Sequence, residues 1–203
     1  EFEDLADLEN SIDQIKLQVD RCADITQAIL QFGRTGEPAI RDLELRTFIP
    51  EVVGMVASKA GVHGIVIKQE MSAQNSDVHG DPRHLQQVLV NLLNNAIDAV
   101  IARHGSSGGV IWIESGPAEN GQVEIKIRDN GSGISAENLN KIFVPFFTTK
   151  PVGQGTGLGL SICHTIVQQH DGELTVHARD AGGSLFRIKL PALADGTDGD
   201  GAE

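Results

Sequence analysis

An apolar stripe at helical spacing over residues 81–103 restricts the fold of this chain more than any other feature. The stripe consists of Leu85, Val88, Leu89, Leu92, Leu93, Ala96, Ile97 and Val100. Asp81 and Pro82 form a strong helix start, because an acidic side chain caps free N–H groups and proline suits the first turn. The sequence therefore predicts one long helix that buries a single face and ends near Arg103.

Strand-like segments surround this helix, and most of them are joined as hairpins. Shorter helices are expected over residues 47–60, with Thr47 as the cap, and over 156–170, while His79 and Gly80 indicate a turn. The expected strands cover residues 42–46, 64–70, 110–115, 122–129, 173–178 and 184–190. This order predicts an α/β fold: a two-layer sandwich of a mixed, mostly antiparallel sheet covered by helices on one face.

The N-terminal segment has the heptad spacing of a coiled coil. Its seam contains Leu5, Leu8, Ile12, Ile15, Val19, Cys22, Thr26 and Ile29. Pairing with another helix, in a dimer or a hairpin, is favoured over packing on the following domain because the spacing persists along the whole segment. We therefore expect a long dimerisation helix in residues 1–34, a linker in 35–40, the α/β domain in 41–191 and a disordered acidic tail in 192–203.

Composition narrows the classes of function. The 203 residues include 16 Lys and Arg against 28 Asp and Glu, a formal net charge of −12. This charge disfavours broad binding to nucleic acid or anionic membranes. Cys22 and Cys163 have no metal-ligand spacing, which argues against a disulfide framework or a zinc site and favours a reducing compartment. Without a membrane-length apolar run or a basic signal sequence, we expect a cytoplasmic fragment with no membrane contact of its own.

Asparagines gather on the polar side of the predicted long helix. Asn91 and Asn95 are four residues apart, so their amides project from one face, and Asp98 follows on it. Amide oxygens are hard neutral donors that suit Mg²⁺, and amide groups can bond phosphate oxygens. A solvated polar face is the competing interpretation, but Asn91, Asn94 and Asn95 in mid-helix weaken it because asparagine is a poor helix former.

Asp129 ends a strand whose apolar residues share its face. Alternation predicts that its carboxylate points inward, where a buried charge needs donors. The amine of a bound base is a natural donor, and Gly131 and Gly133 would let backbone approach a flat ligand. An ordinary Asp-Asn-Gly turn explains these residues equally well.

Two further clusters lie in or after the glycine-rich, loop-like stretch from Asn130 to Gly155. FVPFFTTK at 143–150 suggests a lid with Lys150 able to reach a phosphate, although anchoring of a surface loop is an equally good explanation. GQGTGLGL at 153–160 leads into an apolar helix and offers free N–H groups and a positive dipole end to an anion. It matches neither the phosphate-loop nor the GxGxxG dinucleotide pattern.

In this order, the four clusters resemble the ATP-binding domain of sensor histidine kinases, within the ATPase group that includes gyrase, the ninety-kilodalton heat-shock chaperone and the mismatch-repair ATPase. The resemblance covers about residues 41–191, and FFTTK and GTGLGLSI point to the kinase branch. Gly182, Gly183 and Ser184 fit the late glycine turn of the family. The matching motifs are NLLNNA at 91–96 (the N box), DNGSGI at 129–134 (the first glycine box), FVPFFTTK at 143–150 (the F box) and GTGLGL at 155–160 (the second glycine box).

The resemblance implies ATP and Mg²⁺ as ligands and gives each motif a role. It implies that Asn95 ligates Mg²⁺, that Asn91 contacts the phosphates or metal-bound water, and that Asp129 accepts from the adenine amine. Asn91 and Lys150 are the implied catalytic residues, and Asp98 is assigned no phosphate contact. The other implied nucleotide-binding residues, under a lid between Ile134 and Gly155, are Gly131, Gly133, Ile134, Lys150, Gly155, Thr156, Gly157, Leu158, Gly159 and Leu160.

The resemblance also implies a reaction and partners. The γ-phosphoryl group would pass to a histidine, for relay to a response-regulator receiver domain, in a homodimer formed through the N-terminal helix. The resemblance identifies residues 1–34 with the second helix of a dimerisation and phosphotransfer hairpin. None of the seven histidines fits the acceptor pattern, so the acceptor is expected on the first helix of that hairpin, which is absent from this chain, in preference to a histidine of another protein. A nucleotide-binding pseudokinase and a serine kinase of anti-sigma type are the alternatives. A gyrase-type machine is disfavoured, because Asn91 stands where that branch has a water-activating glutamate.

Overall fold

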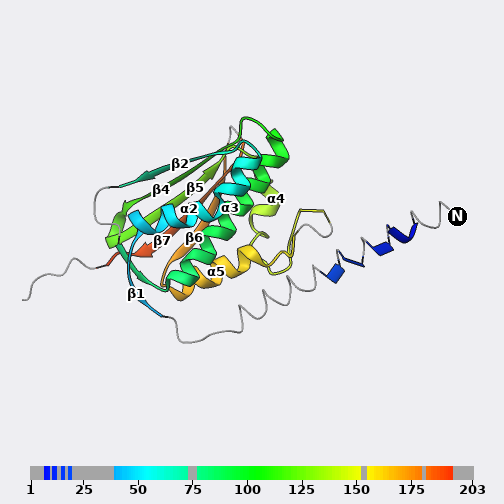
Figure 1. Ribbon diagram of the computed structural model, residues 1–203. Coiled ribbons are helices and arrows are strands. Elements are labelled where there is room, and N and C mark those ends of the chain that lie inside the picture. Colours follow the sequence, from blue (N-terminus) through cyan, green and yellow to red (C-terminus); the bar gives the residue numbers. More distant parts are fainter. Residues whose placement is uncertain are drawn as a thin grey trace, which may run out of the picture.

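A computed structural model describes residues 7–9, 11–12, 15–16, 18–19, 39–72, 77–151, 155–179 and 182–193 of the chain. Its elements are β1 (Arg41–Glu44), α2 (Leu45–Val62), β2 (Val66–Met71), β3 (Asp77–Gly80), α3 (Pro82–His104), β4 (Val110–Ala118), η1 (Glu119–Gly121), β5 (Gln122–Asp129), α4 (Ala136–Leu139), α5 (Gly159–Gln169), β6 (Glu173–Ala178) and β7 (Ser184–Pro191). They form two layers, with α2, α3 and α5 side by side over one face of a five-stranded sheet (Figure 1).

The five-stranded sheet is mixed and has the order β2-β4-β5-β7-β6. β2 and β4 are parallel, and the other neighbouring pairs are antiparallel. β1 and β3 form a separate two-stranded antiparallel sheet. The predicted two-layer sandwich, with a mostly antiparallel sheet covered by helices on one face, is confirmed.

The two sequence periodicities explain how the layers meet. Every second residue of β5 from Val123 to Asp129 is buried, so one face of this strand enters the core. All eight residues of the predicted stripe on α3 are buried as well. The other face of the sheet is polar: the Arg128 guanidinium lies 4.5 Å from the Trp112 ring centroid and 3.3 Å from a Glu114 carboxylate oxygen. The core therefore lies between the helices and the sheet.

Asp81 caps the start of α3, as predicted. Its buried carboxylate accepts the N–H groups of Arg83 at 2.8 Å and of Ala39 at 2.9 Å. Burial raises the pKa of Asp81, but these donors lower it by more, so the pKa lies below its ordinary value. The N–H of Asp81 donates to Nε2 of His170 at 3.0 Å, and this bond ties the start of α3 to the end of α5.

Two helices start at residues other than those predicted. α2 begins at Leu45, not at Thr47, because the Thr47 hydroxyl donates to the Glu44 carbonyl at 3.0 Å and caps no N–H group. α5 begins at Gly159, not at residue 156, because Gly157 has a φ of 69°, outside the helical range.

Three segments differ from the prediction in their type of structure. His79 and Gly80 belong to β3, because they pair with β1 and do not form a turn. The short helix α4 lies within the stretch predicted to be a loop. The predicted tail includes Ala192 and Leu193, yet Ala192 bridges Val78 and the Leu193 N–H donates to the Asp77 carbonyl at 2.8 Å. Residues 194–203 lie outside the described residues.

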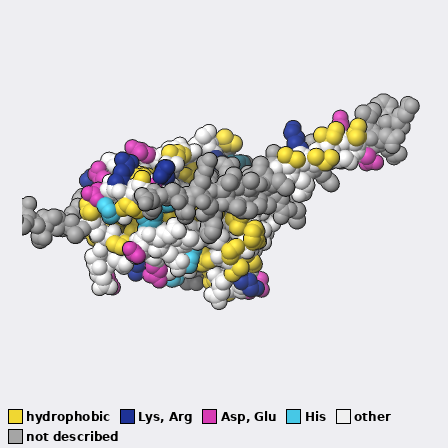
Figure 2. Space-filling model, turned by 90° about the horizontal axis from the view of Figure 1, so that it is seen from below, with side chains coloured by type: hydrophobic (Ala, Val, Ile, Leu, Met, Phe, Trp, Pro, Cys, Tyr) yellow, Lys and Arg dark blue, Asp and Glu magenta, His cyan; other side chains and the backbone are white. Residues whose placement is uncertain are grey.

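The residues described between positions 7 and 19 have helical backbone. The seam residues among them, Leu8, Ile12, Ile15 and Val19, are 53–64% exposed. Figure 2 accordingly shows hydrophobic side chains gathered along this segment. Residues 20–38 lie outside the described residues, so the continuous N-terminal helix and the linker remain predictions. Within the described chain, no helix combines the length and apolarity that crossing a membrane requires.

Candidate functional site

One side of α3 brings the N box to the start of α5. A Cβ atom placed on Gly159, the first residue of α5, would lie 3.9 Å from the Asn91 amide. Within the described residues, no side chain caps the N-terminus of α5. The free N–H groups and the positive dipole end of α5 therefore lie beside Asn91. This contact joins the N box to the second glycine box, as their predicted roles require.

Cys163 lies beneath this contact and is a packing residue. Its Sγ is 3.8 Å from the Val88 carbonyl oxygen. Burial raises the pKa of the Cys163 thiol to about 12, although a hydrogen bond with the Asn91 side chain lowers it. A thiol with this pKa stays protonated at neutral pH, so Cys163 is not a nucleophile.

Asp129 is 1% exposed, and protein donors hold its carboxylate. Oδ1 accepts the Gly131 N–H at 2.7 Å, while Oδ2 accepts the Ser184 hydroxyl at 2.5 Å and the Ser184 N–H at 3.2 Å. A carboxylate offers about four acceptor positions, so these bonds leave one for a ligand. Alternation in β5 correctly predicted the inward carboxylate, whereas no sequence pattern indicated Ser184 as its donor.

Basic residues at the ends of α3 and β6 anchor the first glycine box. Nη1 of Arg103 donates to the carbonyls of Asn130 at 3.2 Å and Gly131 at 3.1 Å. Nε2 of His104 donates to the Asn130 carbonyl at 2.8 Å. After the end of β6, Nη1 of Arg179 donates to the Asp129 carbonyl at 2.8 Å. The protein alone therefore sets the shape of this loop, through residues that the sequence reasoning did not identify.

Contacts within the protein explain why glycine occupies positions 131 and 133. A Cβ atom on Gly131 would come within 2.5 Å of the Ala99 carbonyl carbon in α3. Gly133 has a φ of 77°, and a Cβ atom there would lie 3.0 Å from the Gly183 carbonyl oxygen. Room for a nucleotide base, the role expected for these glycines, is therefore not needed to account for them.

The F box lies directly against the second glycine box. Phe143 and Phe147 pack on the core, and the Phe143 ring centroid is 5.2 Å from that of His164 on α5. Phe146 is 64% exposed and has a φ of 66°. A Cβ atom on Gly157 would overlap its backbone. The two motifs are therefore in contact, whereas the closing movement of a lid remains a prediction.

The side chains of three predicted nucleotide-binding residues are structural. Leu158 is buried, and Ile134 and Leu160 pack on the core. Thr156 accepts the Leu158 N–H at 3.4 Å through its hydroxyl. A Cβ atom on Gly155 would lie 2.9 Å from Thr148 Oγ1, which places this glycine beside the F box. Backbone groups, not these side chains, are therefore what this part of the chain offers to an anion. Gly153 lies outside the described residues.

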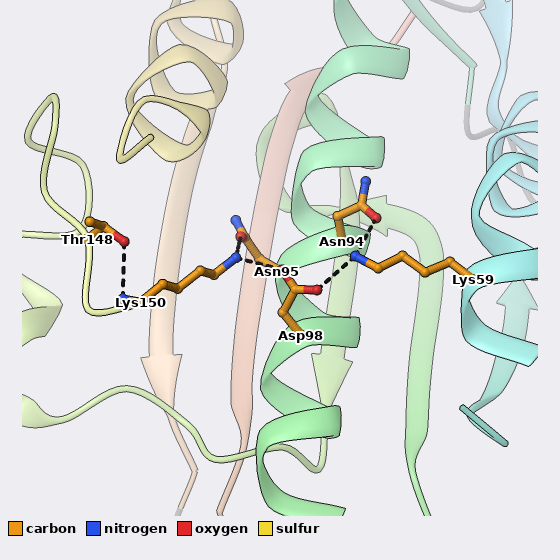
Figure 3. Close-up of polar contacts among 6 residues, drawn as sticks. All are labelled: Lys59, Asn94, Asn95, Asp98, Thr148 and Lys150. Atoms are coloured by element: carbon orange, nitrogen blue, oxygen red, sulfur yellow. Dashed lines mark hydrogen bonds and ion pairs between the residues drawn. The ribbon is translucent and has the colours of Figure 1, made fainter. Parts of the chain in front are cut away.

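Lys150 reaches from the end of the F box to α3 (Figure 3). Its Nζ lies 2.6 Å from Asp98 Oδ2 and 3.4 Å from Asn95 Oδ1. From the other side, Lys59 Nζ of α2 lies 2.8 Å from Asp98 Oδ1 and 3.4 Å from Asn94 Oδ1. The predicted Mg²⁺ ligand Asn95 therefore already accepts a bond from a cationic group. Asp98 lies on the predicted asparagine face of α3, although it is assigned no phosphate contact, and no sequence pattern indicated Lys59.

The residues at Asn95 fit a magnesium ion that takes most of its ligands from elsewhere. Within the described chain, no group of three or more His, Cys, Asp or Glu could hold a metal ion. Mg²⁺ commonly keeps several waters and binds through one or two protein oxygens plus substrate phosphates. Asn95 supplies one such amide oxygen, and this oxygen already accepts a bond from the Lys150 ammonium group. It therefore suits a cation that takes its other ligands from water and phosphate.

A shallow recess of about 340 Å³ lies between the ends of β2, β4 and β5, away from these motifs. Glu70, Glu114 and Lys126 line it. In the pairing of β4 with β5, Asp129 is opposite Ile111, whereas Lys126 is opposite Glu114 toward the far end. The recess therefore belongs to a different part of the sheet from Asp129.

Comparison with known proteins relates the whole arrangement to one family. Residues 80–194 match the family described as histidine kinase-, DNA gyrase B- and HSP90-like ATPases. Sensor histidine kinase ZraS of Escherichia coli is 35% identical over 174 residues, covering 86% of this chain and 36% of ZraS. Two-component sensor PprA of Pseudomonas aeruginosa is 39% identical over 143 residues, covering 70% of this chain and 15% of PprA. The chain thus spans a minor part of these relatives.

Solved structures give the same relationship. The nucleotide-free catalytic domain of histidine kinase ThkA has a TM-score of 0.66 and 34% identity, covering 75% of this chain and 95% of that domain. ThkA in complex with response regulator TrrA has a TM-score of 0.73 and 29% identity, covering 92% of this chain and 52% of that one. This chain belongs to the histidine kinase-, DNA gyrase B- and HSP90-like ATPases, as a homologue of the catalytic domains of sensor histidine kinases.

Proposed function

We propose that this chain is the ATP-binding catalytic region of a sensor histidine kinase, which transfers the γ-phosphoryl group of Mg²⁺-ATP to a histidine on another helix. One observation carries the proposal: motifs far apart in the sequence meet around α3. Asn91 lies beside the N-terminus of α5, and Asn95 lies beside Lys150 of the F box. Asp129 supplies a buried acceptor at the end of β5.

In this proposal, each of these residues binds a different part of the nucleotide. The remaining acceptor position of Asp129 takes a hydrogen bond from the adenine amine, a group that guanine lacks at that position. The free N–H groups at the start of α5 and the backbone from Gly155 to Gly159 hold the phosphates. Asn95 holds Mg²⁺, which supplies positive charge next to the transferred group. Asn91 and Lys150 orient the phosphates from the two sides.

Transfer of the γ-phosphoryl group to a histidine depends mainly on how the reacting groups are positioned. A neutral imidazole is a nucleophile without a base, so the chain has to place the γ-phosphoryl group and offset its charge. Oriented N–H groups, the Asn91 amide and the Lys150 ammonium are suited to that task. The acceptor histidine comes from a helix outside this chain.

The N-terminal segment supports a homodimer in this proposal. Leu8, Ile12, Ile15 and Val19 recur at heptad spacing and are more than half exposed in the single chain. Burying such a seam against a second helix is the driving force of coiled coils. Ile12→Glu together with Ile15→Glu should convert the dimer to a monomer in light scattering. A dimer that withstands both changes would place the interface elsewhere.

Nucleotide binding provides the first test of the proposal. By calorimetry the chain should bind ATP in preference to GTP, and Mg²⁺ should strengthen binding. Asp129→Asn should weaken ATP binding at least about tenfold, because an amide group then faces the Gly131 or Ser184 donors and the acceptor is altered. Asn95→Ala should remove the effect of Mg²⁺. Glu119→Gln, on the exposed η1, is the control for loss of one charge.

Phosphoryl transfer provides the second test. The chain is incubated with γ-labelled ATP and Mg²⁺, alone and with a fragment that carries a histidine-bearing hairpin. Acid-labile label on the fragment, lost with Asn95→Ala, supports the kinase, and onward transfer to a receiver domain supports the response-regulator partner. Acid-stable label on serine favours the anti-sigma class of kinase. Tight binding without transfer favours the pseudokinase.

A further inference from the structure

Asp98 is shared by two lysines that come from different parts of the fold. Lys59 belongs to α2, Lys150 is the last residue of the F box, and Asp98 lies between them on α3 (Figure 3). The Nζ atoms lie 2.8 Å and 2.6 Å from the two carboxylate oxygens, one lysine on each. Each oxygen therefore has its own charged partner.

This carboxylate is charged at neutral pH. Burial raises the pKa of Asp98, but the hydrogen bonds from Lys150 and Lys59 lower it by more, so the pKa lies below its ordinary value. The side chains of Asp98 and Lys150 are both 34% exposed. An ion pair at such a partly exposed position is weak enough to open and strong enough to bias a local equilibrium.

The position of Lys150 conflicts with a magnesium ion on Asn95. Its ammonium group lies 3.4 Å from Asn95 Oδ1. Mg²⁺ binds oxygen ligands at about 2.1 Å, so an ion on this oxygen would repel the ammonium at close range. Lys150 therefore has to leave Asn95 when the ion binds. Lys59 remains on the other oxygen, so Asp98 keeps one partner after Lys150 departs.

The backbone near Lys150 connects this pair to the phosphate-binding loops. The Lys150 N–H donates to Thr148 Oγ1 at 3.2 Å. A Cβ atom on Gly155 would lie 2.9 Å from that Oγ1 and 3.2 Å from Lys150 Cδ. The end of the F box and the start of the second glycine box therefore pack together where Lys150 is held.

We propose that Asp98 is a positioning residue whose ion pair with Lys150 latches the nucleotide-free site, holding the end of the F box on α3 until Mg²⁺-nucleotide displaces the ammonium group from Asn95. The latch rests on the proposed nucleotide-binding function and concerns how the same site changes when the nucleotide binds. Asp98 itself contacts no nucleotide. Lys59 keeps the Asp98 carboxylate oriented while the Lys150 ammonium group moves between Asp98 and the phosphates of the nucleotide.

The first experiment needs no nucleotide. Hydrogen exchange of the 144–150 amides is compared between the wild-type chain and Asp98→Asn, which keeps the shape of the side chain and removes its charge. Exchange should become several-fold faster in Asp98→Asn. Glu137→Gln is the matched control, since it removes one exposed charge from α4. Equal exchange in Asp98→Asn and wild type would overturn the latch.

The second experiment is a double-mutant cycle on the affinity for Mg²⁺-ADP. Asp98→Asn should bind about two- to fivefold more tightly, because no ion pair has to break. In a Lys150→Met background, which has no ammonium group to hold, the same change should have no effect. Weaker binding by Asp98→Asn, or an equal gain in both backgrounds, would refute the latch. If wild type binds no nucleotide, the proposed function fails, whereas the exchange result stands separately.

Discussion

Replacing Gly183 with alanine tests the packing that forms the Asp129 site. Gly183 lies in the turn between β6 and β7 and has a φ of 87°, which favours glycine. A Cβ atom there would overlap the Asp129 carbonyl oxygen and would lie 3.0 Å from the Asn130 Cα. All these neighbours are backbone atoms in the first glycine box, so no flexible side chain can move away.

The expected loss in free energy of unfolding has two parts, and the same substitution at a second glycine measures one of them alone. Alanine at positive φ costs about 1–2 kcal/mol. Overpacking against fixed neighbours typically adds about 1–3 kcal/mol, so Gly183→Ala should lower the free energy of unfolding by about 2–5 kcal/mol. Gly121 has a φ of 66° and no neighbour within 4 Å of an added Cβ atom. Gly121→Ala should therefore show only the backbone part.

Urea denaturation followed by tryptophan fluorescence measures both variants, since the chain has a single tryptophan, Trp112, on β4. Gly183→Ala should unfold at a clearly lower urea concentration than Gly121→Ala, with similar slopes. It should also weaken adenine-nucleotide binding, because relief of the overlap shifts the backbone that precedes Ser184. Equal losses in the two variants would show that overlap with the first glycine box is not what requires glycine at 183.

Three further changes test buried polar groups. Ser184→Ala should lower the free energy of unfolding by about 1.5–3 kcal/mol in urea denaturation, because it removes the 2.5 Å bond to a buried carboxylate. A loss below about 0.5 kcal/mol, the size typical of surface substitutions, would contradict that role. Asp81→Ala should cost about 2 kcal/mol at pH 7 through loss of the α3 cap. Because the pKa of Asp81 is depressed, its contribution is present above the ordinary value and fades as pH falls through the folded-state value, so the two stability curves should converge in acid; parallel curves would count against this. Burial raises the pKa of Cys163 to about 12, so its contribution is complete below the ordinary value and declines as pH rises toward 12. In a Cys22→Ser background, Cys163→Ala should flatten this alkaline decline, and the folded thiol should resist iodoacetamide at pH 8; rapid labelling of the folded chain would refute its burial.

The parts of the fold that follow from local periodicity could be predicted from the sequence. The stripe on α3 needs only the helical repeat, and all its members are buried. The inward carboxylate of Asp129 needs only alternation in β5, which the structure confirms. These predictions succeed because a strand or helix face is set by neighbours along the chain.

Contacts between distant segments could not be predicted in this way. Whether His79 lies in a strand depends on its pairing with Asp42 of β1, which no local pattern specifies. Ser184 reaches Asp129 because β7 pairs with β5 in one particular register. Lys59 reaches Asp98 because α2 packs on α3. Each of these three contacts depends on how the helices and strands are arranged in space. Neither local patterns nor the motif resemblance specifies that arrangement for these residues.

The place of β7 in the sheet has a consequence for synthesis of the protein. β7 follows the other described strands in the sequence, yet it lies between β5 and β6, and it begins with the serine that holds Asp129. On the ribosome the chain emerges from its N-terminus, so the Asn-bearing helix and β5 leave the exit tunnel well before β7. Until then, β5 has an open edge and its buried acid lacks two donors. The full set of donors to the Asp129 carboxylate is therefore in place only after β7 has been synthesised.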